Sequence, residues 1–203
     1  MMNQIEGLYG ELKKNYGKPK GQWSLWCKRP KTEKEKEQVI IESILTQRAN
    51  WKNVQLATEN LKKAGICSLK NILATETERL ALLIRPSGFY QQKAERLKNL
   101  CRFILGTWGG IKKIRKIPTG RMRTELLSLN GIGPETADDI LLYAFQRPVF
   151  VIDEYTRRKA KKLSLSKTFG YQALQELFER NISKDYRLYQ DFHALIVIDG
   201  KEK

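Results

Sequence analysis

Apolar residues recur at helical spacing along most of this chain, and that periodicity limits its fold more than any other feature of the sequence. Residues 38–50 show it clearly, with five apolar side chains on one broad face: Val39, Ile40, Ile41, Ile44 and Leu45. The strand-like run at residues 148–152 is short and has no second run to pair with, so it predicts a buried extended connector. The chain is therefore predicted to be all-α, with helices over residues 38–50, 51–64, 76–84, 91–105, 121–129, 134–146, 155–163, 170–181 and 184–198.

The length of 203 residues falls between one and two ordinary domains, and 41% hydrophobic residues supply enough apolar surface for a packed core. We therefore expect two lobes. A helical barrel lobe over residues 38–145 is predicted to contain a helical hairpin at residues 121–146, and residues 1–37 with 146–203 are predicted to form the second lobe. No run approaches the roughly 18 apolar residues that cross a bilayer, and no signal-peptide core is present, which predicts a soluble, cytoplasmic protein without a membrane partner.

The chain is strongly basic, with 38 Lys and Arg against 22 Asp and Glu and a net charge of +16. Such a charge indicates an anionic partner, although a basic surface also serves solubility or thermostability. Two blocks of one sign, residues 112–123 and 157–167, contain basic residues and no acid, a pattern typical of a phosphate-binding track. Nucleic acid is the favoured partner.

The three cysteines, Cys27, Cys67 and Cys101, are far apart and form no CxxC pair. This spacing gives no zinc signal, the odd number argues against a disulfide framework, and three thiols cannot bind a four-thiolate iron–sulfur cluster. We therefore predict no metal ligand set. The single histidine, His193, is interpreted as a structural residue of a late helix.

A tight glycine turn, Asn130-Gly131-Ile132-Gly133, joins two predicted helices. Its glycines can adopt positive φ and let another backbone approach, and Pro134 then opens the next helix at a position where its missing N–H costs nothing. The first-turn amides of that helix form a phosphate site. An ordinary helical corner is the alternative, which the wider pattern Leu129-x-Gly-x-Gly-x-x-Thr136-Ala137 disfavours.

Asp153 follows Gly133 by twenty residues and stands between an apolar run and a basic helix that contains Arg157. A carboxylate at this position can cap the helix. It can also stabilise a positive charge that develops on a sugar, or orient a water molecule. The two roles are compatible, because capping holds the carboxylate in one rotamer.

Several segments of the chain resemble the endonuclease III superfamily of DNA glycosylases. LNGIGPETADDILLYAF followed by VFVIDEYTRR resembles its helix-hairpin-helix and Gly/Pro-rich loop with an aspartate, and ILTQRANWKNV resembles the segment with its duplex-inserting glutamine. RPSGFYQQKAERL and FHALIVIDGKEK are similar too, especially to the branch containing 3-methyladenine DNA glycosylase III. The resemblance covers residues 38–203.

The resemblance implies a two-lobed helical glycosylase fold in which the hairpin and the aspartate lie at the mouth of a groove. Gly131, Ile132 and Gly133, with the amides after them, would bind a DNA phosphate. Gln47 would enter the gap left by a flipped nucleotide, and Asp153 would be the catalytic carboxylate. Thr136 of the hairpin pattern and Arg157 of the basic helix are added to the predicted DNA-binding residues.

Two departures from the family pattern change the expected activity. Members that also cut the DNA backbone carry a lysine two residues after the second glycine, and this chain has Glu135 there, which cannot form a Schiff base. Many relatives place a four-cysteine cluster directly after the segment that ends here at Lys203. We therefore expect no cofactor from this chain, and a 4Fe-4S cluster only if residues beyond Lys203 are missing.

Three functions follow from these observations. The favoured one is a monofunctional glycosylase that acts as a monomer on double-stranded DNA and removes alkylated purines such as 3-methyladenine. The alternatives are an endonuclease III-like glycosylase for oxidised or mismatched pyrimidines, and a non-catalytic helix-hairpin-helix module. Trp23 and Trp26 are predicted either to stack on the flipped base or to staple the amino-terminal arm to the core. Phe89 and Tyr90 are expected to be packing residues.

Overall fold

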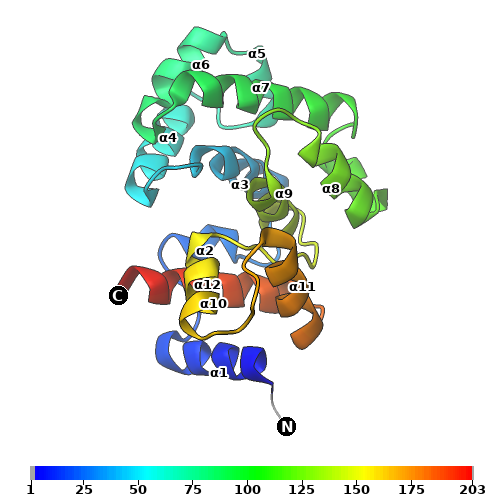
Figure 1. Ribbon diagram of the computed structural model, residues 1–203. Coiled ribbons are helices and arrows are strands. Elements are labelled where there is room, and N and C mark those ends of the chain that lie inside the picture. Colours follow the sequence, from blue (N-terminus) through cyan, green and yellow to red (C-terminus); the bar gives the residue numbers. More distant parts are fainter. Residues whose placement is uncertain (1–2, 203) are drawn as a thin grey trace. The chain divides into compact units, whose positions relative to one another are not determined.

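The computed structural model describes residues 3–202, and every regular element in that range is helical (Figure 1). The predicted all-α fold is confirmed. None of these helices is both long and apolar enough to cross a membrane. The chain divides into two compact units, which we call the central unit (residues 30–140) and the terminal unit (residues 3–29 with 141–202).

The central unit is a single stretch of chain, drawn from light blue to green in Figure 1. Its elements are α3 (Glu33–Leu45), α4 (Trp51–Lys63), α5 (Leu69–Ala74), α6 (Thr77–Leu83), η1 (Arg85–Ser87), α7 (Tyr90–Gly106), η2 (Ile111–Lys116), α8 (Thr119–Leu127) and α9 (Pro134–Asp139). The long helix α7 packs against α3, α5 and α6. The five apolar residues predicted to share a face of α3 are all fully buried, which explains why that helix lies in the core.

The terminal unit combines both ends of the chain, so that blue α1 lies beside red α12 in Figure 1. Its elements are α1 (Gln4–Tyr16), α2 (Trp23–Trp26), α10 (Glu154–Lys162), α11 (Tyr171–Asn181) and α12 (Tyr186–Glu202). The π-helical turn η3 (Ile140–Ala144) carries the chain from α9 into this unit. The helix predicted over residues 134–146 is therefore a short α-helix followed by a π-helical turn. Such π-helical turns are frequent at functional sites.

Helix α3 begins at Glu33 rather than at residue 38, and α1 was not predicted; a capping box defines the first residues of each. We predicted no helix before residue 38. Asn3 and Glu6 cap α1 reciprocally, and Thr32 and Glu35 do the same for α3, each side chain accepting from the other residue's backbone N–H. These caps stabilise charged turns that carry few apolar residues.

The first predicted helix also ends earlier than expected, at Leu45 rather than at residue 50. Lys93 is fully buried, and its Nζ donates to the carbonyl of Leu45 at 2.8 Å and to that of Ser87 at 2.7 Å. Arg48 then adopts a positive φ of 50°, and Asn50 caps the next helix. The chain between the two helices is therefore a fixed turn, and this turn carries Gln47.

The predicted extended connector is confirmed at residues 146–153, where Phe150, Val151 and Ile152 are fully buried. Its backbone bonds to side chains rather than to a second strand. The N–H of Phe150 donates to Glu179 Oε1 at 2.7 Å, and its carbonyl accepts from Gln175 Nε2 at 2.7 Å. Helix α11 thus supplies the polar partners that a buried backbone requires, and the connector delivers Asp153 to the start of α10.

Candidate active site

The glycine turn of the central unit forms a closed corner between α8 and α9. Gly131 has a φ of +80°, and a Cβ built on it would lie 2.1 Å from Arg96 Nε. Gly133 has an ordinary φ of −89° and open space at its Cβ position. The expectation that both glycines exploit positive φ is therefore wrong for Gly133, whose bare surface instead leaves room for an approaching molecule.

The rest of the hairpin separates buried from accessible groups. The Ile132 side chain is buried and its N–H donates to the carbonyl of Leu129, so this residue anchors the turn. Pro134 opens α9, and Glu135 is exposed in its first turn, where amides have no acceptor within the helix. A negatively charged ligand would therefore approach at Gly133 and at the amides that follow Pro134.

Gln47 is bonded to this hairpin through its side-chain amide. Its Nε2 donates to the Gly131 carbonyl and to Thr136 Oγ1, both at 3.0 Å, and its Oε1 accepts from Arg96 Nη1 at 2.8 Å. The structure therefore brings together three of the predicted DNA-binding residues: Gln47, Gly131 and Thr136. It adds Arg96, which sequence reasoning missed because nothing in the neighbourhood of Arg96 in the sequence marks it as a partner of the turn.

Asp153 stands at the N-cap of α10 in the terminal unit. Its Oδ1 accepts the Thr156 N–H at 2.7 Å, which confirms the predicted cap, and its side chain is 15% exposed. Its Oδ2 lies 3.5 Å from Nε2 of His193. Burial alone would raise the pKa of the Asp153 carboxyl, but His193 and the Thr156 amide outweigh it, and the pKa lies below its usual range. The group is thus an ionised, fixed, partly desolvated carboxylate.

Trp23 and Trp26 are buried in an aromatic cluster of the same unit rather than displayed on its surface. The Trp23 ring centroid lies 5.7 Å from that of Tyr143 and 5.8 Å from that of His193, and the two tryptophan rings meet edge to face. This geometry fits the stapling alternative for the pair. It also makes Trp23 a neighbour of the imidazole that faces Asp153, so its role as a base-pocket wall stays a prediction.

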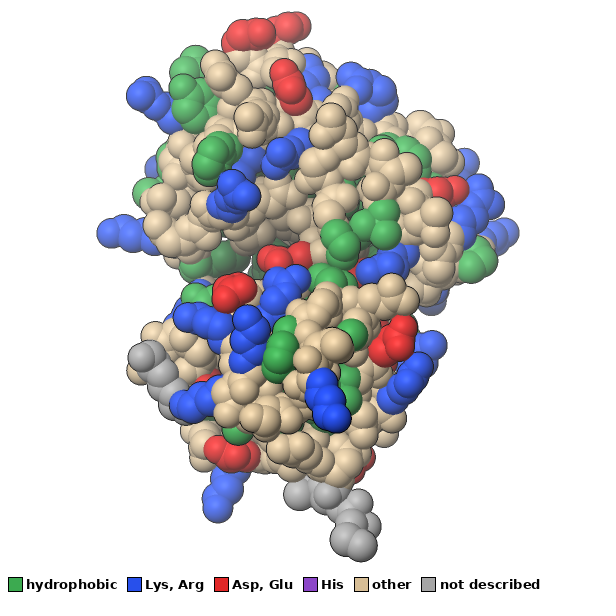
Figure 2. All heavy atoms as spheres, viewed as in Figure 1, with side chains coloured by type: hydrophobic (Ala, Val, Ile, Leu, Met, Phe, Trp, Pro, Cys, Tyr) green, Lys and Arg blue, Asp and Glu red, His purple; other side chains and the backbone are tan. Residues whose placement is uncertain are grey.

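Arg157 lies one turn into α10, with its guanidinium 5.8 Å from the ring centroid of Tyr171. Lys and Arg side chains gather over α10 and, in the central unit, over α8 (Figure 2). Both clusters coincide with the one-sign blocks of the sequence. The interaction of Arg157 with DNA stays a prediction.

Phe89 contradicts its expected role as a packing residue. Its side chain is 55% exposed, and its backbone adopts a left-handed conformation with a φ of +47° just before α7. An exposed aromatic residue on a strained backbone is uncommon and points to function. The preceding Gly88 gives the only local signal, since it marks a sharp turn.

The cysteines do not fit an iron–sulfur or zinc site. Burial raises the pKa of Cys101 to about 12 and that of Cys67 to about 11, which keeps both thiols protonated, whereas metal ligands are thiolates. Cys27 belongs to the other unit. Across residues 3–202, no group of three or more His, Cys, Asp or Glu side chains has the arrangement of a metal site.

The predicted DNA-binding turn belongs to the central unit, and the predicted catalytic carboxylate belongs to the terminal unit. The turn and the carboxylate are each held by hydrogen bonds within their own unit. The predicted lobe boundaries at residues 38 and 145, and a single groove that both halves face, stay predictions.

Comparisons with a family model and with curated proteins point to the same family. A family model described as "HhH-GPD superfamily base excision DNA repair protein" matches residues 41–184. A curated protein of Methanocaldococcus jannaschii, named "Putative DNA repair glycosylase", is 44% identical over 163 residues, covering 79% of this chain and 74% of that protein. Endonuclease III of Thermotoga maritima is 28% identical over 158 residues, covering 77% and 70%.

Solved structures agree with these sequences. The crystal structure of the H. pylori 3-methyladenine DNA glycosylase bound to 1,N6-ethenoadenine matches with a TM-score of 0.80 and 32% identity, covering 98% of this chain and 95% of that one. A trapped covalent complex of endonuclease III with DNA matches with a TM-score of 0.76 at 21% identity, covering 100% and 88%. The second likeness supports the fold alone.

Proposed function

The chain belongs to the HhH-GPD superfamily of base excision DNA repair proteins, and we propose that it flips a damaged base out of double-stranded DNA and hydrolyses its N-glycosidic bond. A stacked base is out of reach, so such an enzyme must extrude the nucleotide, at a cost of a few kcal/mol that is smallest for a weakened pair. The observation that carries the proposal is Asp153, a fixed carboxylate whose pKa lies below its usual range.

The proposed chemistry needs one carboxylate and a water molecule. As the bond between sugar and base breaks, its electron pair leaves with the base and the sugar gains positive charge. Asp153 stabilises that charge, and water then adds its hydroxyl to the sugar and releases a proton. An alkylated purine already carries a positive charge and departs as a neutral base, so it needs no general acid.

The proposed DNA contacts divide between the two units. Gly131, Ile132 and Gly133 with the amides that follow hold one phosphate, and Thr136 and Arg157 add contacts on either unit. Gln47 fills the gap in the duplex. Its side chain makes three hydrogen bonds in this structure, so insertion requires it to exchange those bonds for contacts with the DNA.

Alkylated purines such as 3-methyladenine are the proposed substrates. Support comes from the likeness to the H. pylori enzyme named for that base, which covers nearly the whole of both chains. Trp23 and Trp26 are proposed to form an aromatic wall of the base pocket, because electron-rich rings attract a cationic base. The likeness to endonuclease III favours the second candidate, a glycosylase for oxidised or mismatched pyrimidines.

We further propose that the enzyme is monofunctional, because Glu135 occupies the position of the lyase lysine and offers no amine. It is expected to act as a monomer on DNA in the cytoplasm of a bacterium or archaeon, in association with the nucleoid. Excision is expected to need no cofactor and to persist after treatment with a chelator.

The test uses duplexes that carry alkylated adenine, thymine glycol or a G·T mismatch, with half of each reaction treated with alkali. We expect strand breaks in the alkylated duplex, and only after alkali. Breaks without alkali would contradict the monofunctional assignment, a preference for thymine glycol or the mismatch would favour the second candidate, and no breaks in any duplex would leave a non-catalytic DNA-binding module.

Asp153→Asn is expected to abolish excision while leaving affinity for the damaged duplex nearly unchanged. Asp185→Asn is the matched control, because Asp185 is a second aspartate of the terminal unit whose Oδ1 accepts a backbone N–H, that of Arg187 at 2.8 Å. Full turnover by Asp153→Asn would show that the carboxylate is only a helix cap.

A further inference from the structure

His193 has one ring nitrogen with a short polar contact and one without. Its side chain is 3% exposed, and Nδ1 lies 2.7 Å from the Tyr143 hydroxyl. Its Nε2 is buried and has no hydrogen-bond partner among residues 3–202, yet it points at Asp153 Oδ2, 3.5 Å away. A buried ring nitrogen without a hydrogen bond costs free energy. The Asp153 carboxylate, which Nε2 faces, is the group placed to offset that cost.

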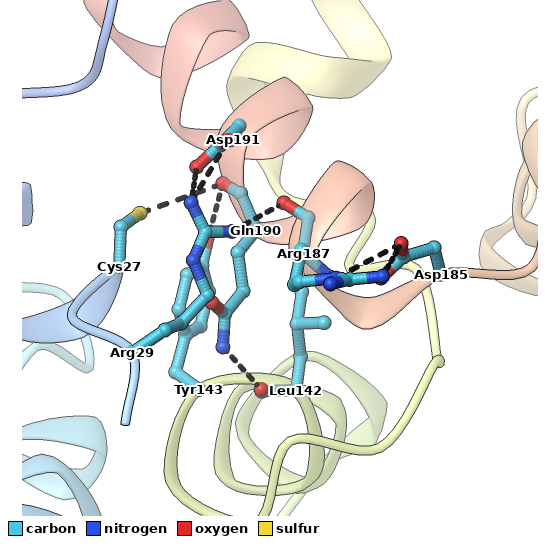
Figure 3. A network of polar contacts seen from close by, with 8 residues as sticks. All are labelled: Cys27, Arg29, Leu142, Tyr143, Asp185, Arg187, Gln190 and Asp191. Atoms are coloured by element: carbon cyan, nitrogen blue, oxygen red, sulfur yellow. Dashed lines mark hydrogen bonds and ion pairs between the residues drawn. The ribbon is translucent and has the colours of Figure 1, made fainter. Parts of the chain in front are cut away.

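The imidazole is held in place from the side away from Asp153. The Tyr143 hydroxyl is also 3.3 Å from the Gln190 carbonyl, and the Gln190 side chain donates to the Leu142 carbonyl at 2.7 Å (Figure 3). Trp23 meets the imidazole edge to face, with ring centroids 5.8 Å apart. Helix α12 and the π-helical turn η3 are thus tied together around His193, and the ring has little freedom to rotate.

Only some proton arrangements satisfy this chain of contacts. If the Tyr143 hydroxyl donates to Nδ1, the neutral ring carries its proton on Nε2, which then faces the Asp153 carboxylate as a donor. If both nitrogens are protonated, Nδ1 donates to Tyr143, and Tyr143 donates to the Gln190 carbonyl. Both arrangements direct an N–H at Asp153. A neutral ring protonated only on Nδ1 would instead face the carboxylate with a lone pair, so Asp153 and Tyr143 together select a ring that carries a proton on Nε2.

We propose that His193, oriented by Tyr143, is a positioning residue. It holds Oδ2 of Asp153 in the orientation in which the carboxylate stabilises the positive charge that develops on the sugar. The Thr156 amide bonds to Oδ1 and the His193 N–H faces the other oxygen, so rotation of the carboxylate is opposed at both oxygens. This inference rests on the proposed function of Asp153. It assigns His193 a role beyond the structural one that its sequence context indicates.

Two other ionisable side chains of α12, Asp199 and Lys201, bond to groups other than Asp153. Asp199 of α12 pairs with Lys159 of α10 and accepts from Tyr16. Lys201 of α12 donates to Gln22 Oε1 at 2.9 Å, and burial lowers the pKa of its ammonium, although the nearby Asp153 carboxylate partly offsets that effect. Asp199 and Lys201 thus bond to other side chains, whereas His193 Nε2 lies 3.5 Å from Asp153 Oδ2.

The test compares substitutions that keep different halves of the imidazole. His193→Gln places an amide nitrogen near the position of Nε2 and can still reach Asp153. His193→Asn keeps the contact toward Tyr143 but falls short of the carboxylate. Single-turnover excision is expected to fall about ten- to a hundredfold in His193→Asn and within about threefold in His193→Gln, because displacement of a reacting group by about 1 Å has effects of this size.

Tyr143→Phe provides a gentler variant that removes a single oxygen atom. It is expected to slow excision and to move the acidic limb of the pH–rate profile to higher pH, with the affinity for the damaged duplex unchanged. A merely structural role would not move that limb. Equal rates and profiles for wild type, Tyr143→Phe and His193→Asn would overturn the proposal.

A second readout does not depend on activity. His193 is the only histidine in the chain, so its imidazole nitrogen signals are assigned in an NMR spectrum without further variants. Asp153→Asn is expected to change the Nε2 signal more than the Nδ1 signal, and Asp185→Asn to change neither. Absence of that response would overturn the contact itself. Absence of excision by the wild-type enzyme, with the NMR response present, would instead contradict the proposed function.

Discussion

Replacement of Gly131 by alanine tests how the hairpin holds Gln47. The added Cβ would lie 2.1 Å from Arg96 Nε and 2.5 Å from Arg96 Cδ, on a backbone with a φ of +80°. An L-residue in the left-handed region costs about 1–2 kcal/mol. Displacement of Arg96 would also break its 2.8 Å hydrogen bond to Gln47 Oε1, at a net cost of about 0.5–1.5 kcal/mol.

Gly131→Ala is therefore expected to lower the free energy of unfolding by about 2–3 kcal/mol, which for a chain of this size corresponds to a fall in Tm of about 4–12 °C. Gly133→Ala is the matched control. Its Cβ meets nothing within 4 Å and its φ is −89°, so the loss should stay below about 1 kcal/mol, the difference between glycine and alanine as an N-cap.

Urea unfolding of the two variants, each in wild-type and Arg96→Ala backgrounds, measures the steric part separately. Without the Arg96 side chain, Gly131→Ala should cost only the backbone strain, so the double-mutant cycle should give a coupling of about 1 kcal/mol. Equal losses in both backgrounds would show that Arg96 does not limit the turn. Equal losses from Gly131→Ala and Gly133→Ala would refute the assignment of strain to Gly131.

Three further changes test the packing within each unit. Burial, with repulsion from Arg96, lowers the pKa of Lys93 to about 8, so the unfolded chain binds more protons between that pH and about 10.4. Stability of the wild type relative to Lys93→Met should therefore rise over this range, as measured by urea unfolding at successive pH values. Gly200→Ala should lower the free energy of unfolding by about 1–3 kcal/mol, since its Cβ would lie 2.5 Å from the Tyr155 ring. Gly10→Ala in α1 has open space and should raise it by about 0.5–1 kcal/mol, and a gain in both glycine variants would contradict the contact at Tyr155.

Features that depend on neighbouring residues were predictable from the sequence. The cap formed by Asp153 involves Thr156, which is three positions away. The glycine corner is likewise formed by a few consecutive residues. The buried connector was predictable because a lone strand cannot satisfy its backbone. Its partners, Gln175 and Glu179 of α11, were not, since polar side chains on a helix reveal no target.

The features that hold the site depend on contacts between distant segments. Gln47 is 84 positions from Gly131 and 49 from Arg96, and His193 is 50 positions from Tyr143. A histidine on an apolar helix face has the same sequence pattern whether it fills a core or faces a carboxylate. Only packing of α12 against α10 distinguishes the two, which explains why the structural interpretation of His193 was incomplete.

Glu135→Lys tests whether the first turn of α9 approaches the sugar, as the family resemblance implies. A lysine amine there could attack the aldehyde of an abasic sugar and lose water to form an imine, which borohydride reduces to a stable cross-link. We expect cross-linking of Glu135→Lys to an abasic duplex and none for the wild type.

Glu135→Gln is the control for charge, because it removes the favourable interaction of an acid with the helix N-terminus, worth about 0.3–1 kcal/mol, without supplying an amine. It should bind the abasic duplex somewhat more tightly than the wild type and form no cross-link. If Glu135→Lys binds that duplex as tightly as Glu135→Gln and still forms no cross-link, position 135 does not face the sugar. Monofunctional excision would then have to be explained by the geometry of the hairpin, since the identity of one residue could no longer account for it.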